Sequence, residues 1–182
     1  MSDSFHVEGA EIVFRSHVFN VEKRTVRHGE ERFERDVAVH PGAVAVLVIN
    51  DQGEVGFIRQ FRATFEQELL EIPAGTRDVQ GEEPLETAKR ELIEEMGLEA
   101  REWTLIGRFM NSPGWSTQVM WVYEARGLSE RAREPAGAEE RSATIHWFSL
   151  EELRTRLRDA FAIDSTTAIA LHRLFGNFLD DF

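Results

Sequence analysis

Apolar and polar side chains alternate along the first part of the chain and then give way to longer apolar runs, which predicts strands followed by a mixture of strands and helices. Residues 9–40 alternate around a turn signal at 28–31, as expected for an N-terminal antiparallel β-hairpin. The uninterrupted apolar run 42–49 predicts a buried strand, and a turn at 51–53 leads into a second strand at 54–61.

The later elements are predicted by the same periodicity and turn signals. We expect strands at 102–110, 118–125 and 143–148, and helices at 84–96, 150–158 and 165–179. A polar stretch at 127–142 is too long to be a simple connection. Strands and helices are mixed without a regular βαβ alternation, so the predicted fold class is α+β, with a mixed sheet packed between helices as an α/β/α sandwich.

The helix at 84–96 has the clearest ends. Pro84 suits a first helical position, and Gly97 suits the left-handed residue just past the last turn. The apolar residues between them recur at three- and four-residue steps and predict one buried stripe: Leu85, Ala88, Leu92 and Met96.

Three carboxylates of this helix share one face. At about 100° per residue, Glu91, Glu94 and Glu95 lie within roughly 100° of one another, with Glu95 at the border of the buried stripe. Arg90 precedes Glu94 by four residues and can pair with it, which leaves Glu91 and Glu95 free. Because Mg²⁺ and Mn²⁺ prefer carboxylate, carbonyl and water oxygens, this face can hold such an ion; the alternative is a solvated acidic surface.

Composition narrows the class of protein. The chain has 182 residues, a formal net charge of −12 at pH 7 and no cysteine. The negative charge opposes nucleic-acid binding, although bound cations and a local arginine cluster can still attract a small anion. The lack of cysteine is compatible with a reducing cytosol. No apolar run approaches a membrane span and no basic-then-apolar signal begins the chain, so we expect a cytoplasmic protein without membrane association.

The spacing around the helix resembles the Nudix hydrolase box. Glu82 is followed by seven residues and then by RELIEEMGL at 90–98, which matches the Arg-Glu, Glu-Glu and Gly positions of the box in order. One spacing departs, because six residues separate Gly75 from Glu82 where the family has five. The resemblance implies a Nudix domain at 41–182, preceded by an extension at 1–40.

Three further segments resemble the ADP-ribose pyrophosphatase branch of this family: IRQFR at 58–62, LEIPAG at 70–75 and NSPGWS at 111–116. In the last of them, Pro113 lies sixteen residues after Gly97, where that branch carries its proline. The resemblance therefore covers the chain from roughly residue 35 to the end.

The IPAG segment also suggests a metal ligand on physical grounds. Pro73 opposes regular strand pairing and Gly75 allows a turn forbidden to other residues, so the Ala74 carbonyl can point out of the sheet. The alternative is that IPAG merely ends a strand. By resemblance, the ligands of the catalytic Mg²⁺ or Mn²⁺ are Ala74, Glu91, Glu95 and the accompanying Glu94.

Arginines and a tryptophan are candidate substrate contacts. Arg59 and Arg62 flank an apolar strand and could clamp a diphosphate with their planar guanidinium groups, or remain exposed solubilising residues. The resemblance favours Arg62 for the diphosphate and implies that Arg35 contacts the base, the alternative being an ordinary exposed strand arginine. It also implies Pro113 in the site, where Trp115 could stack on an adenine or ribose or anchor its own loop.

The attacking water needs a base within hydrogen-bond reach. The resemblance implies a mobile catalytic glutamate at the end of the polar stretch, where either Glu139 or Glu140 could fill the role. Glu94 is the next candidate, and the alternative is that both loop residues are solvated charges.

These features predict a metal-dependent Nudix pyrophosphohydrolase that cleaves ADP-ribose to AMP and ribose 5-phosphate. One alternative is a Nudix hydrolase of another nucleoside diphosphate sugar, such as GDP-mannose. A ligand-sensing module without turnover is a further alternative, against which the complete set of acids argues. Because an isolated hairpin is marginal in water, the alternating apolar residues of 9–40 predict packing against a second copy of the chain in a homodimer. The resemblance implies the same arrangement, in which the N-terminal hairpin helps to build the partner's site.

Overall fold

The computed structural model describes residues 4–158, 160 and 162–176. The chain divides into two compact units. The N-terminal unit consists of Met1–Gly42 with Met110–Val119, and the main unit consists of Ala43–Phe109 with Met120–Phe182.

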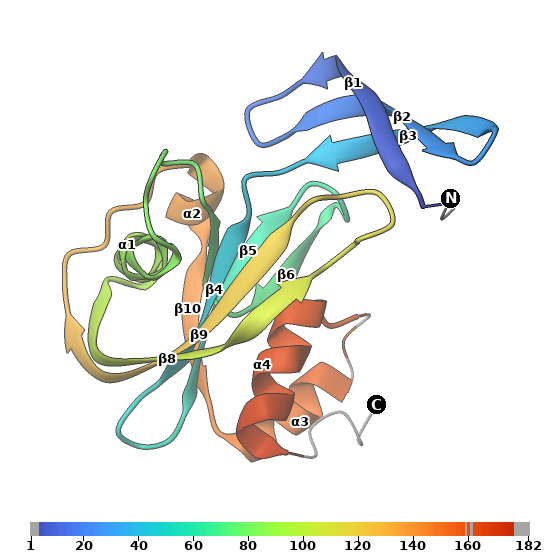
Figure 1. Ribbon diagram of the computed structural model, residues 1–182. Helices are drawn as coiled ribbons and strands as arrows, with labels where there is room; N and C mark the ends of the chain where they lie inside the picture. Colours follow the sequence, from blue (N-terminus) through green and yellow to red (C-terminus); the bar gives the residue numbers. More distant parts are fainter. Residues whose placement is uncertain (1–3, 159, 161, 177–182) are drawn as a thin grey trace. The chain divides into compact units, whose positions relative to one another are not determined.

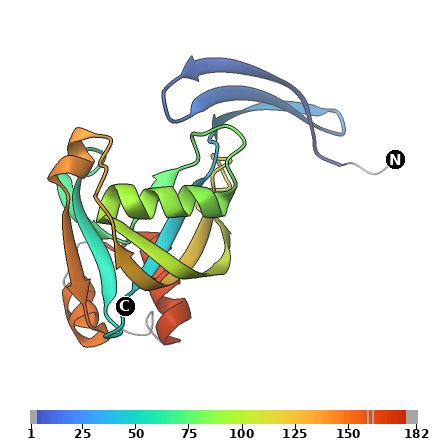
Figure 2. The ribbon, with the colours of Figure 1, turned by 90° about the vertical axis from the view of Figure 1, so that its left-hand side faces the viewer.

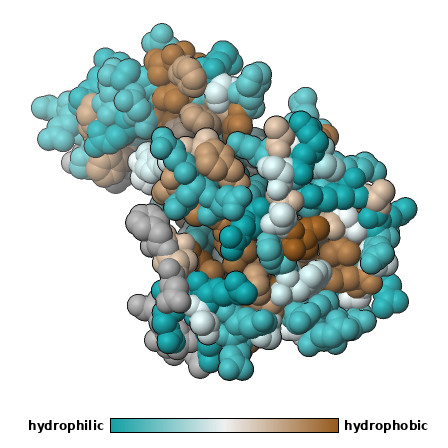
Figure 3. Space-filling view, turned by 180° about the vertical axis from the view of Figure 1, so that it is seen from behind, coloured by the Kyte–Doolittle hydropathy of each residue, from teal (hydrophilic) through white to brown (hydrophobic). Residues whose placement is uncertain are grey.

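The N-terminal unit is a three-stranded antiparallel sheet in the order β1-β2-β3, with strands at His6–Arg15, Asn20–His28 and Glu31–Val39 (Figure 1). The hairpin of β2 and β3 turns at Gly29, where φ is 57°, as the turn signal predicts. The expected hairpin begins at residue 9, but its first arm is divided into β1 and β2, so the sheet has three strands and not two. Apolar side chains gather on the surface of this unit, at the upper left of Figure 3, and Phe5 and Phe14 are more than half exposed.

The main unit is built on a mixed sheet whose central path runs β10-β5-β4-β9-β8, with β6 paired to β5 and β7 paired to β4. Strand β4 is parallel to β9 and antiparallel to β5 and β7. The strands lie at Ala43–Ile49 (β4), Val55–Arg62 (β5), Gln67–Glu71 (β6), Ala74–Thr76 (β7), Leu98–Met110 (β8), Val119–Glu130 (β9) and Thr144–Phe148 (β10).

Helices cover both faces of this sheet, so the predicted layered α+β architecture is confirmed (Figures 1 and 2). Helix α1 packs on one face, where Ala88 and Leu92 meet alternate residues of β4. On the other face α3 and α4 pack against the remaining β4 side chains. The helices span Pro84–Met96 (α1), Ala138–Ser142 (α2), Leu150–Arg158 (α3) and Ser165–Phe175 (α4).

Strand β4 is buried on both faces, as its uninterrupted apolar sequence predicts. Strands β6 and β7 and the short helix α2 were not expected, and β8 begins four residues before the predicted strand. Helix α4 ends at Phe175, and the part of the predicted helix at 177–179 lies outside the described residues. None of the helices in the described part of the chain is long and apolar enough to span a membrane.

Candidate active site

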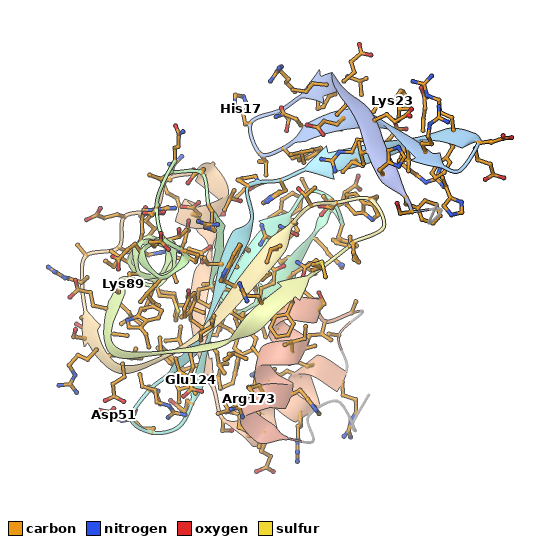
Figure 4. The ribbon with its side chains drawn as sticks, in the orientation of Figure 1. His17, Lys23, Asp51, Lys89, Glu124 and Arg173 are labelled. Atoms are coloured by element: carbon orange, nitrogen blue, oxygen red, sulfur yellow. The ribbon has the colours of Figure 1, made fainter. Side chains whose placement is uncertain are left out.

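Helix α1 holds the acidic residues rigidly because both of its ends are well defined. Pro84 occupies the first turn, and Gly97 adopts the left-handed conformation at φ 65°, where its N–H donates to the Ile93 carbonyl. The outer face of the helix carries an ordinary surface ion pair between Lys89 and Glu86, with Lys89 labelled in Figure 4. The opposite face directs its acids toward the sheet.

Two of these acids are buried. Glu91 is 7% exposed and Glu95 is 4% exposed, so the acid at the border of the apolar stripe is buried together with it. Burial raises the pKa of Glu91 to about 7, and burial together with the charge of Glu91 raises that of Glu95 to about 8. Burial also raises the pKa of the more accessible Glu94. Two adjacent buried carboxylates favour a bound cation, because a cation offsets their loss of hydration.

The IPAG segment joins β6 to β7 beside these acids. The Val46 N–H donates to the Pro73 carbonyl at 2.8 Å, and the Ala74 N–H donates to Oε2 of Glu95 at 2.8 Å. Successive residues of an antiparallel strand point their backbone groups to opposite edges. The carbonyl of Ala74 is therefore directed to the same edge as its N–H, away from β4.

Gly75 has a different role from the predicted one. Its φ is not positive, and it lies in β7 paired with Val44, so no turn depends on it. A Cβ atom at this position would lie 1.9 Å from the carboxyl carbon of Glu91, so glycine is required because the Glu91 carboxylate packs directly on the strand backbone. Glu91 therefore packs on Gly75 of β7, and Glu95 accepts a hydrogen bond from the preceding residue of the same strand, Ala74.

Arg90 is the main counter-charge of the helix acids. Its Nη1 lies 2.9 Å from Oε2 of Glu94, which confirms the predicted pair, and also 2.9 Å from Oε1 of Glu91. Glu91 is therefore not free, contrary to the prediction. The other terminal nitrogen, Nη2, lies 3.3 Å from Asp78 and 3.5 Å from Glu82.

The structure does not bring Arg59 and Arg62 together. Both lie on β5, but residues three apart point to opposite faces of a strand. Arg62 is on the α1 side, where it pairs with Glu71 at 2.8 Å and its positive charge lowers the pKa of Glu95. Arg59 is on the other side and lines a hollow of about 280 Å³ with Arg156 of α3. The predicted clamp by both arginines is therefore wrong in its geometry.

The two candidate bases lie next to each other in α2. The carboxylate of Glu140 accepts a hydrogen bond from the Ala136 N–H at 2.6 Å, and its charge raises the pKa of Glu91, Glu94 and Glu95. Glu139 contributes its backbone carbonyl to the helix, where it accepts from the Ser142 hydroxyl at 2.8 Å. Electrostatic proximity to the helix acids thus favours Glu140.

The remaining predicted contacts belong to the N-terminal unit. The guanidinium of Arg35 lies 4.4 Å from the centre of the Phe33 ring, and its Nη1 donates to the Glu34 carbonyl at 2.8 Å. Trp115 is 60% exposed, and its carbonyl accepts from the Ala38 N–H at 2.7 Å, which fastens the loop containing Pro113 to β3. Trp115 thus fixes its own loop through its backbone while its ring stays accessible.

Sequence reasoning missed Glu71 and Gln60. Both Gln60 and Arg62 donate to Oε2 of Glu71, at 3.1 and 2.9 Å, which orients Arg62. The signal was present, because Glu71 immediately precedes IPAG and Gln60 stands in IRQFR. Their contact depends on the pairing of β5 with β6, in which Ile58 lies opposite Glu71, and local sequence does not determine this register.

The oxygen-only donors around Glu91 and Glu95 fit a hard divalent cation. Among the described residues, no three acidic, histidine or cysteine side chains form a metal cage by themselves. Such a cage is not needed for Mg²⁺, which usually keeps several waters and takes one or two carboxylates together with substrate phosphates.

Comparison with known proteins identifies the class. Residues 39–169 match the family model of the NUDIX domain, and the chain belongs to the Nudix family. It is 35% identical over 171 residues to the ADP-ribose pyrophosphatase of Mycobacterium tuberculosis (strain ATCC 25618 / H37Rv), a match that covers 91% of this chain and 83% of the relative. It is 36% identical over 141 residues to the ADP-ribose pyrophosphatase of Bacillus subtilis (strain 168), which covers 78% of this chain and 76% of the relative.

A solved structure has the same fold. The crystal structure of an ADP compounds hydrolase matches with a TM-score of 0.82 at 23% identity, over 97% of this chain and 95% of the other. The resemblance inferred from the box and from IRQFR, LEIPAG and NSPGWS is therefore confirmed at the level of the family.

Proposed function

We propose that the protein is a divalent-metal-dependent pyrophosphohydrolase that cleaves ADP-ribose to AMP and ribose 5-phosphate. The observation that carries the proposal is the pair of buried carboxylates, Glu91 and Glu95, held against the backbone of Ala74 and Gly75. The names of the relatives, both ADP-ribose pyrophosphatases, support ADP-ribose as the substrate.

The ion is Mg²⁺ in this proposal, with Mn²⁺ as a substitute. Glu91, Glu95 and the Ala74 carbonyl would hold it, with Glu94 close by and neutralised in part by Arg90. When bound, the ion would neutralise the diphosphate and make a water nucleophilic near neutral pH. Because burial raises the pKa of Glu91 to about 7 and that of Glu95 to about 8, a bound cation would favour their ionised forms near neutral pH.

The protein's own groups have separate tasks. Glu140 takes a proton from the attacking water, because a carboxylate within hydrogen-bond reach can act as a general base. Arg62, oriented by Glu71, binds the diphosphate through a planar, permanently charged group. Arg35, Pro113 and Trp115 are the proposed contacts to the base or ribose.

We further propose a homodimer, with an extension at 1–40 that serves dimerisation and a Nudix domain at 41–182. Exposed apolar side chains on the sheet of the N-terminal unit, such as Val13 and Phe14, are suited to burial against a second copy. We further propose a cytoplasmic location, which the lack of cysteine supports.

The test is release of phosphomonoester products from ADP-ribose, GDP-mannose and other nucleoside diphosphate compounds, detected with a coupled phosphatase in Mg²⁺ or Mn²⁺. We expect ADP-ribose to give the highest kcat/KM and chelation to abolish turnover. A higher kcat/KM for GDP-mannose would replace the substrate, whereas a folded protein without turnover on any of the compounds would support a ligand-sensing module instead.

A further inference from the structure

Arg77 fastens the loop that leads from β7 into α1. Its guanidinium carbon lies 4.7 Å from the centre of the Trp121 ring on β9, and its Nη2 donates to the Glu82 carbonyl at 2.9 Å. Its Nε atom is buried and has no hydrogen-bond partner, which is consistent with a guanidinium packed face-on against an aromatic ring. The Arg77 side chain thus connects the start of the loop to Glu82 at its end and to Trp121 of the sheet.

This loop is the place where the chain is one residue longer than the Nudix box spacing. Residues 78–81 are exposed, and the loop closes on itself through the Asp78 N–H to the Thr76 carbonyl and the Glu82 N–H to the Val79 carbonyl. A short loop with few internal bonds and an exposed tip needs fixed ends to hold one conformation. Arg77 fixes the end of the loop at Glu82 by linking it to Trp121 of the sheet.

The position of Glu82 matters because its carboxylate is largely buried beside Arg90. Its side chain is 16% exposed and lies 3.5 Å from Nη2 of Arg90, while Nη1 of the same arginine lies 2.9 Å from both Glu91 and Glu94. A displacement of Glu82 would therefore change the orientation of Arg90, the counter-charge that the helix acids share.

We propose that Arg77 is a positioning residue for the metal site, acting through the Glu82 carbonyl and Arg90. Stacking on Trp121 orients the Arg77 guanidinium, and the hydrogen bond from this guanidinium to the Glu82 carbonyl fixes the end of the loop. Lysine cannot replace it, because an ammonium lacks the planar fork that stacks and donates at the same time. The inference rests on the metal site proposed above.

Binding of Mn²⁺ without substrate, followed by the electron paramagnetic resonance signal of the free ion, tests this proposal. Groups that orient metal ligands typically change affinity by 10- to 100-fold, so we expect Arg77→Lys and Arg77→Ala to weaken Mn²⁺ binding roughly tenfold. Thermal unfolding of the metal-free variants should stay close to wild type. Hydrogen exchange of the amides at 77–83 should become faster in both variants.

Arg126→Ala is the matched control. Arg126 lies on β9, the strand of Trp121, and pairs with Glu124, so its loss removes an arginine ion pair from this strand without touching the loop. Its Mn²⁺ affinity should equal that of wild type.

The outcomes separate this inference from the proposed function. If wild type does not bind Mn²⁺, the metal site itself is wrong. If wild type binds Mn²⁺ and folded Arg77→Lys and Arg77→Ala bind it equally well, the metal site stands and the positioning role of Arg77 is refuted. A loss of affinity in Arg126→Ala as large as that in Arg77→Ala would also refute it, because the effect would then not depend on the loop.

Discussion

Replacing Glu95 by Gln distinguishes the contribution of this carboxylate to metal binding from the effect of its burial on the stability of the fold. Glutamine has nearly the same size, and its amide oxygen can still accept the hydrogen bond from the Ala74 N–H. The variant therefore removes one negative charge from a site that is 4% exposed and leaves the packing of α1 intact.

The size of the effect follows from the pKa of Glu95, which burial moves from 4.5 to about 8. Below pH 4.5 the carboxyl is protonated in the folded and the unfolded chain. Between pH 4.5 and about 8 the unfolded chain loses this proton while the folded chain retains it, so the stability of the metal-free protein falls as the pH rises. At about 1.4 kcal/mol per pKa unit, the upper limit is on the order of 4 kcal/mol at pH 8.

Urea unfolding in EDTA measures this difference. We expect Glu95→Gln to be more stable than wild type by on the order of 2 kcal/mol at pH 8 and to approach wild type at pH 5. Added Mn²⁺ should stabilise wild type more at pH 8 than at pH 6, and should have little effect on the variant. Turnover of the folded variant should fall by at least about a hundredfold.

The control is Glu86→Gln, the same substitution on the exposed face of the same helix, which should change stability by less than about 0.5 kcal/mol. A Glu95→Gln protein that is less stable than wild type at pH 8 without metal would refute the reasoning about burial. Near-normal turnover of that variant would refute the metal assignment.

Three further predictions concern the rest of the site. Glu140→Gln should lower kcat by roughly 10²-fold or more with little change in KM, whereas Glu139→Gln should be nearly silent; equal kinetics of the two variants would move the base elsewhere. Gly75→Ala should displace the Glu91 carboxylate and weaken Mn²⁺ binding at least about tenfold, and an unchanged Mn²⁺ titration would contradict the close packing. Deleting residues 1–40 should give a monomer by light scattering, with KM raised far more than metal binding is weakened; a full-length chain that is monomeric and fully active at micromolar concentration would oppose the dimer.

Local signals were sufficient to predict the helix that carries the acids. Pro84 and Gly97 act through their own backbone geometry, so the ends of α1 can be inferred without knowledge of any partner. The pair of Arg90 with Glu94 depends only on helical spacing and was predicted for the same reason.

Features that depend on strand pairing could not be predicted in the same way. The need for glycine at position 75 arises from a glutamate sixteen residues later in the sequence, and the packing of β7 against α1 brings the two together. The contact of Arg90 with Glu91 was also not predicted, because residues adjacent in sequence do not normally face each other on a helix. The opposite faces of Arg59 and Arg62 are a different case, because the two-residue period of a strand already excludes a shared face.

The pairing of β4 also has a consequence for how the protein is made. Ala43 pairs with Met120, so one edge of β4 stays open during synthesis until 77 further residues have been added. The strand, AVAVLVI, has no charge and no proline, and such segments aggregate readily when they are exposed. A fragment that stops before β9 would contain α1 and all of its acids yet leave the β9 edge of this strand unpaired, so the part of the chain that carries the acids depends for its solubility on a strand translated after it.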